Sequence, residues 1–220
     1  MPFGSSQWMY ASGGFYNNLA TQSLRFDDGS SAYLTRTPSS AGNRKTWTWS
    51  GWAKLGNPAV AYTLFSAGAD GSNRTEIDWR SDSRLQIFTN TSGVLVGSIV
   101  WNPNKYRDPS AWYHLVFISD TTNATNTDRF RLYVNGSRVT GISGTSGENT
   151  FPSQNADTHI NNTVAHSVGR LQHAANSYFD GYLTEVNFID GQALDPSYFG
   201  EFKNGVWIPK AYTGSYGTNG

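Results

Sequence analysis

The sequence predicts an all-β protein, an antiparallel β-sandwich built from two sheets. Its 220 residues include 23 glycines, 12 tyrosines, 12 phenylalanines and 8 tryptophans. Many aromatic side chains beside many turn formers are typical of short strands joined by tight loops. Short alternating segments follow one another along the chain, and no segment except a turn after Asp195 has helical spacing. We therefore expect one domain of near a dozen strands.

In the first half of the chain, expected strands follow one another at short spacing. Residues 23–26 and 32–37 flank a turn at Asp27-Asp28-Gly29. The segment TWTWSGWAK (46–54) alternates tryptophans with threonine and serine, as a strand with one buried side does. Further strands are expected at 62–67, 74–80, 84–90 and 94–100.

The second half begins with WYHLVFISD (112–120), whose nearly continuous apolar run predicts a buried central strand. Residues 130–139 form the clearest hairpin, because Asn135-Gly136 supplies both residues of a type I′ turn. Residues 140–163 are polar without a period, which predicts a surface loop, and 166–170 is a short strand.

The stretch YFDGYLTEVNFIDGQAL (178–194) predicts the strand around which the other strands are arranged. Every second residue from Tyr182 to Phe188 is expected on one side of it. Asp190-Gly191 ends the strand, and Asp195-Pro196 offers a helix start with an Asp cap and Pro at the first helical position. We expect the buried core between the sheets to include Trp49, Trp112, Leu132, Tyr182 and Val186.

The domain organisation follows from where this strand pattern starts and stops. Residues 1–21 combine Gly, Ser and Asn with aromatics and have no period, which indicates an N-terminal arm. Residues 22–202 carry the sandwich, and 203–220 form a Gly- and aromatic-rich tail.

Charge and composition exclude several classes of partner. Sixteen basic and sixteen acidic side chains cancel, so we expect no nucleic-acid partner and no anionic membrane surface. No apolar run approaches the roughly 18 residues of a membrane span, and the first ten residues lack the charged and apolar regions of a secretory signal. Without cysteine, neither disulfides nor thiolate metal sites are expected.

Four motifs carry a resemblance to a known family. WYHLVFISD, LYVNGSRV, SVGR and YFDGYLTEVNFIDGQALDPSYF follow one another in the order found in laminin-G-like, concanavalin A-like jelly-roll domains. The resemblance covers roughly residues 22–200 and implies the two-sheet jelly roll. It does not choose among lectins, adhesion modules, glycosidases and passive structural domains, which all use this fold.

A narrower resemblance concerns SAYLTRTPSSAGNRKTWTWSGWAK, INNTVAHSVGR and the tail GVWIPKAYTGSYGTNG. These segments look like jelly-roll domains in structural and tail proteins of marine bacteriophages. The resemblance implies a non-catalytic virion protein, such as a tail fibre, head fibre or decoration protein. Its partners would be other virion subunits, including copies of itself, and glycans of the host surface.

One strand resembles a catalytic motif in part. One family of glycosidases on this fold carries Glu, an aliphatic residue, Asp, any residue and Glu along one strand. Glu76 and Asp78 match the first two acids, but Arg80 stands where the proton donor should be. A retaining glycosidase needs two carboxyl groups about 5–5.5 Å apart, one of them protonated, and arginine donates no proton at neutral pH. We therefore expect a charged outer face with Ile77 and Trp79 packed inward, and no enzyme.

A sugar site is suggested by the loop after residue 100. Sugars stack their apolar faces on Trp or Tyr, and their hydroxyls need amide, carboxylate or guanidinium partners. The loop supplies this mixture in Trp101, Asn102, Tyr106, Arg107 and Asp108. The alternative is that Trp101 and Tyr106 merely cover a strand end.

The two ends of the chain suggest contacts between subunits. Aromatic residues are enriched in the cores of protein interfaces, and both ends combine them with Gly, Ser and Asn. The expected contact residues are Trp8, Tyr10, Trp207, Tyr212 and Tyr216. The alternative is that Trp207 and Ile208 pack on the edge of their own domain.

Metal sites and cofactors find little support. The four histidines, at 114, 159, 166 and 173, lack ligand spacing, and we expect His114 to be packed and hydrogen-bonded. Asp70-Gly71-Ser72-Asn73 offers oxygen ligands suited to calcium, but it reads equally well as an ordinary turn. We expect no cofactor, with calcium as the alternative.

Overall fold

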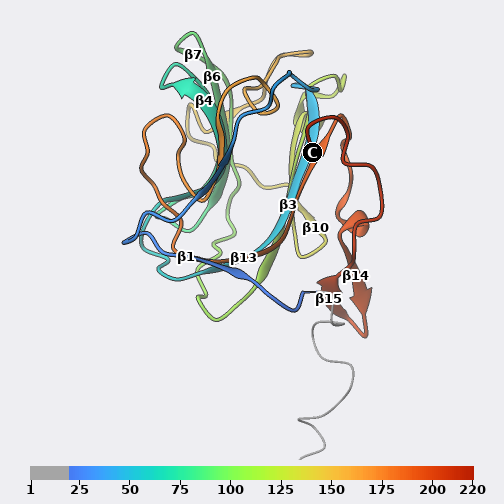
Figure 1. Cartoon of the computed structure of the whole chain (residues 1–220). Helices are drawn as coiled ribbons and strands as arrows, with labels where there is room; N and C mark the ends of the chain where they lie inside the picture. Colours follow the sequence, from blue (N-terminus) through green and yellow to red (C-terminus); the bar gives the residue numbers. More distant parts are fainter. Residues whose placement is uncertain (1–19) are drawn as a thin grey trace, which may run out of the picture.

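The computed structural model describes residues 20–220 and contains fifteen strands in this range. Thirteen of them form two antiparallel sheets that face each other, and the other two form a separate hairpin (Figure 1). The predicted all-β sandwich is confirmed. Twelve of the observed strands lie within a few residues of predicted ones, whereas the strands at 149–150, 200–203 and 206–209 were not predicted. No helix in the described part of the chain is long and apolar enough to cross a membrane.

The six-stranded sheet has the stretch 178–194 near one edge, as its second strand. In spatial order its strands are β1 (Leu24–Phe26), β13 (Gly181–Asp190), β3 (Thr46–Leu55), β8 (Tyr113–Asp120), β9 (Phe130–Val134) and β10 (Ser137–Val139). The turn between β9 and β10 is the predicted one, since Asn135 and Gly136 have φ of 49° and 80°.

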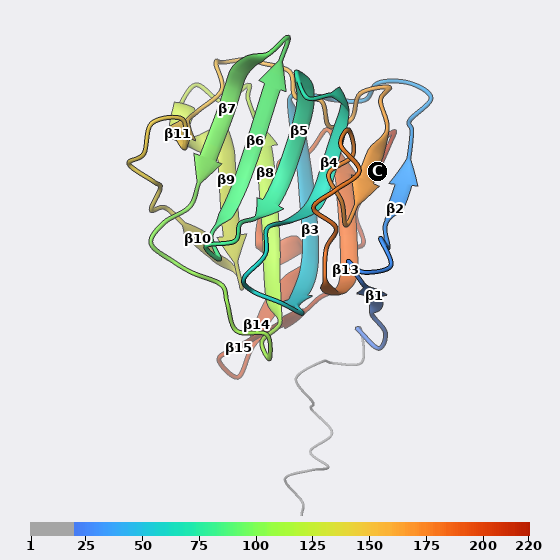
Figure 2. The ribbon, with the colours of Figure 1, turned by 90° about the vertical axis from the view of Figure 1, so that its left-hand side faces the viewer.

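The seven-stranded sheet is shown face-on in Figure 2. In spatial order its strands are β11 (Asn149–Thr150), β7 (Val94–Val100), β6 (Leu85–Thr91), β5 (Asn73–Trp79), β4 (Tyr62–Asp70), β12 (His166–Val168) and β2 (Leu34–Arg36). The four central strands, β4 to β7, are consecutive in sequence, so tight turns suffice to join them.

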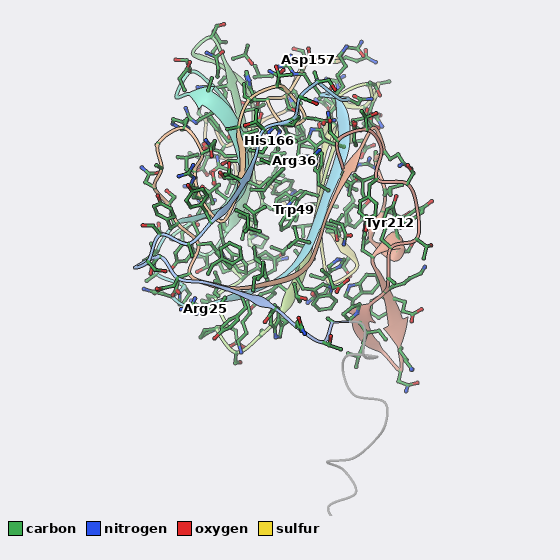
Figure 3. The ribbon with its side chains drawn as sticks, in the orientation of Figure 1. Arg25, Arg36, Trp49, Asp157, His166 and Tyr212 are labelled. Atoms are coloured by element: carbon green, nitrogen blue, oxygen red, sulfur yellow. The ribbon has the colours of Figure 1, made fainter. Side chains whose placement is uncertain are left out.

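The core lies between the sheets and is rich in aromatic rings. Trp49 and Leu132 are fully buried there, as predicted. The ring of Trp49 meets that of Phe117 edge-on with centroids 6.1 Å apart, and Figure 3 shows Trp49 pointing into the space between the sheets.

Three other core predictions are wrong. Tyr182 and Val186 are each 38% exposed, whereas Leu183 is buried in the core. The register of β13 against β3 shifts between Thr184 and Asn187, and Glu185 there has a left-handed φ of 50°. This bulge breaks the period of two, so the predicted alternation fails along the strand. Trp112 is half-buried because it precedes β8 instead of lying in it.

The outer face of the six-stranded sheet is covered by the C-terminal segment (residues 195–220), as Figure 1 shows. This segment contains a 3₁₀ helix, η3 (Pro196–Tyr198), capped by Asp195, and the hairpin β14 (Gly200–Lys203) and β15 (Val206–Pro209). A second apolar cluster forms beneath it from Val116, Ile118, Ile189 and Phe199.

The polar stretch 140–163 is not entirely a surface loop. Thr158 and the three residues that follow are buried. The hydroxyl of Thr158 donates to the carbonyl of Arg44 at 2.7 Å and accepts the indole N–H of Trp47 at 3.0 Å. A short 3₁₀ helix, η2 (Asn126–Asp128), lies in the connection before β9.

Candidate functional site

The charged side chains of β5 lie on the outer face of the seven-stranded sheet. Ile77 and Trp79 point into the core and are almost fully buried, as predicted. Because side chains alternate along a strand, Glu76 and Asp78 lie on the opposite face, with Arg80 directly after the strand. The predicted charged outer face is therefore present.

Neighbouring strands add polar groups to this face in register with Asp78. Thr63 on β4 and Gln86 on β6 are its cross-strand partners. The hydroxyl of Thr63 donates to Asp78 Oδ1 at 2.7 Å. Gln86 accepts a hydrogen bond from Arg80 at 2.9 Å and donates one to Ser98 at 3.0 Å. The face is thus an ordered polar network and not a set of independent surface charges.

A loop after β12 walls off one side of this network. Residues 169–177 fold back beside β4, as Figure 2 shows, and a bridge between Leu171 and Asn176 closes the loop. Ser66 on β4 fixes it, donating to the carbonyl of Arg170 at 2.8 Å and accepting the N–H of Gln172 at 2.9 Å.

The resulting pocket has a volume of about 350 Å³, within the range of about 300–1,000 Å³ typical of small-molecule sites. We call it the β5 pocket. It is lined by Ala61, Tyr62, Thr63, Glu76, Asp78, Arg80, Ser81, Gln86, Leu171 and Ser177.

The two acids of the β5 pocket are poorly solvated. Glu76 is only 7% exposed. Its Oε1 pairs with Arg74 at 3.3 Å, while its Oε2 is buried and has no hydrogen-bond partner in the described part of the chain. Burial raises the pKa of the Glu76 carboxyl, and burial together with the charge of Glu76 raises the pKa of Asp78 well above its usual range.

The positive charge of Arg80 is already engaged. Its guanidinium forms an ion pair with Glu148 at 3.0 Å and lies 3.7 Å from Asp82. It also donates to Gln86. Among the lining residues, the buried side-chain atoms without a hydrogen-bond partner are Glu76 Oε2, Arg80 Nε and the hydroxyl of Tyr62, whose ring packs in the core against Phe179.

The five residues predicted to bind sugar are not arranged as a site. Trp101 is 2% exposed and meets Phe117 edge-on in the core. Tyr106 is 8% exposed and packs against Tyr113, so neither ring can stack on a sugar. Asn102 is half-buried, and only Arg107 and Asp108 are exposed. The alternative, that both rings cover a strand end, is what the structure shows.

The residues predicted to contact another subunit lie in different environments. Trp8 and Tyr10 lie outside the described residues. Trp207 is 9% exposed, and its indole donates to His114 Nδ1 at 3.0 Å. Trp207 therefore packs on its own domain, as the alternative interpretation expected, and its role in a subunit contact stays a prediction. Cβ atoms at Gly136 and Gly200 would collide with its ring, so both positions need glycine.

The other two predicted contact residues, Tyr212 and Tyr216, belong to the C-terminal segment, and Tyr212 packs against the second apolar cluster. Tyr212 stacks on Phe199 with ring centroids 5.2 Å apart, and Figure 3 shows it outside the six-stranded sheet. Tyr216 is 40% exposed, and its hydroxyl donates to Asn187 at 2.9 Å. Their role in contacts with another subunit stays a prediction.

The residues considered for metal binding favour local hydrogen bonds. His114 is packed and hydrogen-bonded, as expected, since its Nε2 lies 2.9 Å from the Ser50 hydroxyl. Asp70 accepts the N–H of Ser72 at 2.8 Å and the amide of Asn73 at 3.1 Å, as in an ordinary Asx turn.

One acidic group within residues 20–220 is close enough to share a cation. The carboxylates of Asp27, Asp28 and Asp180 lie within 4.8 Å of one another. However, Arg25 already forms an ion pair with Asp180 at 2.6 Å. Arg25 thus supplies part of the charge that a metal ion would bring, and calcium stays an untested alternative.

Part of the β5 pocket could be predicted from the sequence. The alternation of β5 placed Glu76 and Asp78 on one face, and the short connections to β4 and β6 make Thr63 and Gln86 their neighbours. No local signal places Leu171 and Ser177 over this face, because their loop is fixed by contacts distant in sequence.

Comparison with known proteins supports the fold. None of the curated protein sequences compared with this chain matches it significantly. Among solved structures, laminin α1 domains LG4-5 from mouse have a TM-score of 0.53 at 11% identity, with 80% of this chain and 43% of that chain covered. A candidate carbohydrate binding protein from Bacteroides ovatus has a TM-score of 0.53 at 14% identity, with coverages of 81% and 45%.

A third similar structure is the K499G mutant of NanB sialidase from Streptococcus pneumoniae, with a TM-score of 0.51 at 15% identity and coverages of 83% and 29%. This chain therefore spans less than half the length of each of the three structures. At these identities the likeness concerns the fold alone. The model of the concanavalin A-like lectin/glucanases superfamily matches residues 28–197, and the chain belongs to this family.

Proposed function

We propose that the protein is a non-catalytic glycan-binding module and that the β5 pocket is its binding site. The observation that carries the proposal is the buried, unpartnered Oε2 of Glu76 in a concave site of about 350 Å³. Buried polar groups without a partner are rare, because each lost hydrogen bond is costly. A sugar hydroxyl that donates to this oxygen would satisfy it.

The remaining lining of the pocket suits a polyhydroxylated ligand. Asp78 and Gln86 are held in place by Thr63, Ser98 and Arg80, so their positions are fixed before a ligand arrives. Preorganised polar groups lower the entropic cost of binding. Phe88, which lies beside Glu76 across the strands, adds a half-buried ring to the same face.

The same geometry argues against hydrolysis. Arg80 follows the two acids where a third acid would be needed for the partly matched catalytic motif. Glu185, another candidate acid, lies on β13 of the other sheet and lines a different pocket. We expect no release of reducing ends from β-glucans or galactans. Turnover that disappears in Glu76→Gln would contradict this expectation.

Binding can be tested with a glycan array followed by titration calorimetry. Gln86→Ala and Asp78→Ala should each weaken the binding of any glycan found by roughly 10-fold or more, as the loss of a hydrogen bond to a buried polar group does. The matched control is Glu201→Ala, because Glu201 is an exposed acid on β14. Equal affinity in all four proteins would move the site elsewhere, and an array without any bound glycan would overturn the proposed function.

We further propose that this module works within a virion, as its sequence resemblance implies, in particle assembly or in adhesion to host glycans. Support comes from Tyr198 and Phe202 in the C-terminal segment, which are 47% and 62% exposed. Clustered exposed apolar side chains often mark an interaction surface. Particle micrographs with a labelled protein test the location. Sedimentation of the free protein, with and without residues 1–18, tests homo-oligomer formation.

A further inference from the structure

Most hydrogen-bond donors in the β5 pocket are already used, whereas Glu76 keeps a free acceptor. The two terminal nitrogens of Arg80 serve Gln86 and Glu148, and the Gln86 amide serves Ser98, while the buried Arg80 Nε has no hydrogen-bond partner in the described part of the chain. The Thr63 hydroxyl serves Asp78. What remains on Glu76 is an acceptor. A ligand group beside Glu76 must therefore bring a donor, and a ligand carboxylate meets a guanidinium that is already paired with Glu148.

The charges around the pocket also favour a ligand that brings hydrogen-bond donors and positive charge. Glu76 and Asp78 bring two negative charges from one face of β5. Arg74 forms an ion pair with Glu76, while its guanidinium also lies over the Phe88 ring at 4.7 Å. The charge of Arg80 also acts on Asp78, but Arg80 is shared with Glu148 and Asp82.

The other elements around the pocket add no further positive charge to it. β4 and β6 contribute Thr63 and Gln86, which are uncharged. In the loop 169–177, the Arg170 guanidinium is held over the Tyr33 ring at 3.6 Å. Asp78 is thus an incompletely neutralised acid beside a second acid, and burial and this proximity both raise its pKa.

From this arrangement we infer that the β5 pocket selects its glycan by charge: it prefers a sugar with a protonated amino group and rejects sugar acids. This inference rests on the proposed glycan-binding function and adds the substrate class. An ammonium group is a three-fold donor with a positive charge. It can donate to Glu76 Oε2 and to Asp78 together, which lowers the repulsion between the two carboxylates.

The test uses an array of matched hexose oligomers, in which each glycan is present in neutral, 2-amino and uronic acid forms with the same linkage. The wild-type protein should bind the amino form roughly 10-fold or more tightly than the neutral form, as expected for a hydrogen bond between charged groups. The uronic acid form should not bind.

Isosteric variants assign this preference to the two acids. Glu76→Gln and Asp78→Asn keep the shape of the side chains and remove their charge. Each should reduce the amino-over-neutral preference to within about 2-fold while the neutral form still binds. Glu201→Gln removes an equal charge from an exposed site on β14 and should leave the preference unchanged. Melting curves verify that all variants are folded.

The outcomes separate this inference from the proposed function. No binding of any form overturns both. Binding with a preference for the neutral or the uronic acid form overturns the charge selection and leaves the glycan-binding function standing. A preference for the amino form that Glu201→Gln abolishes as fully as Asp78→Asn would reflect general charge attraction and would also overturn the inference.

Discussion

The outer faces of the two sheets differ in what covers them. On the six-stranded sheet, the C-terminal segment lies across the face and buries a second apolar cluster. On the seven-stranded sheet, the loop 169–177 lies beside β4 on this face, and the β5 pocket stays open next to it. The same fold therefore carries one face closed for stability and one face available to a ligand.

The buried polar groups of the two faces differ in how completely they are hydrogen-bonded. On the closed face, His114 is hydrogen-bonded on both ring nitrogens, with the Ser50 hydroxyl on one side and the Trp207 indole on the other. On the open face, Glu76 keeps a buried oxygen without a partner in the described chain. Satisfied buried networks stabilise a fold, whereas incompletely satisfied ones are expected at functional sites.

The largest effect should follow from opening the closed face with Trp207→Ala. The substitution removes a buried indole and leaves His114 Nδ1 without its donor, so it should lower the free energy of unfolding by about 3–5 kcal/mol. Urea unfolding followed by tryptophan fluorescence measures it. Phe202→Ala on the same hairpin is the control. Because Phe202 is 62% exposed, it should change stability by less than about 1 kcal/mol. If Trp207→Ala lowers the free energy of unfolding by no more than the control does, the Trp207 ring contributes no packing to the closed face.

The second prediction concerns acid. Burial lowers the pKa of His114 to about 3, whereas the unfolded chain takes up this proton near pH 6.5. Between these values the unfolded state binds more protons, so stability falls as the pH falls from about 6.5 to 3. The upper limit of this loss of stability is on the order of 5 kcal/mol. His166, with a pKa lowered to about 4 by burial, adds to it with the same sign.

NMR titration of the imidazole signals of the folded protein measures this directly. His173 is more exposed than His114 and serves as an internal comparison. A His114 signal that titrates near pH 6.5 in the folded state would contradict the closed face.

The open face should respond to pH in the opposite direction. Because the pKa values of Glu76 and Asp78 are raised, the folded state binds more protons than the unfolded state above pH 4. These acids therefore destabilise the fold as the pH rises. Asp78→Asn should raise the free energy of unfolding at pH 7 by on the order of 1 kcal/mol, while it weakens amino-sugar binding. A variant that is less stable than the wild type at pH 7 would show that Asp78 supports the fold.

The sequence was sufficient to predict the sandwich and the open face, but not the closed one. Ile77 and Trp79 point inward because β5 keeps a strict period of two, and the turn at Asn135-Gly136 needed only local chemistry. In β13 the bulge at Glu185 moved Tyr182 and Val186 out of the core. Nothing in the local pattern marks a bulge, since it depends on pairing with β3.

The docking of the C-terminal segment could not be predicted from the sequence either. Trp207 has an aromatic and glycine-rich neighbourhood that suits an exposed arm as well as a docked hairpin. The hairpin docks because His114, 93 residues earlier in the chain, accepts a hydrogen bond from the Trp207 indole on the outer face of the sheet. Long-range partners of this kind also explain why Trp101 and Tyr106 were expected at a sugar site, whereas the structure places both in the core.

The smallest change in stability is expected from calcium, which tests whether the acidic loops at Asp70 and Asp180 bind a metal ion. Both carboxylate oxygens of Asp70 accept hydrogen bonds within its own turn, and Asp180 is paired with Arg25. We therefore expect the melting temperature to change by less than about 1 °C between excess chelator and millimolar calcium. Binding at 100 times the dissociation constant would instead stabilise the fold by about 2.7 kcal/mol, a shift of several degrees. If such a shift occurs, its loss in Asp70→Asn would assign the ion to the turn, and its loss in Asp28→Asn to the cluster near β1.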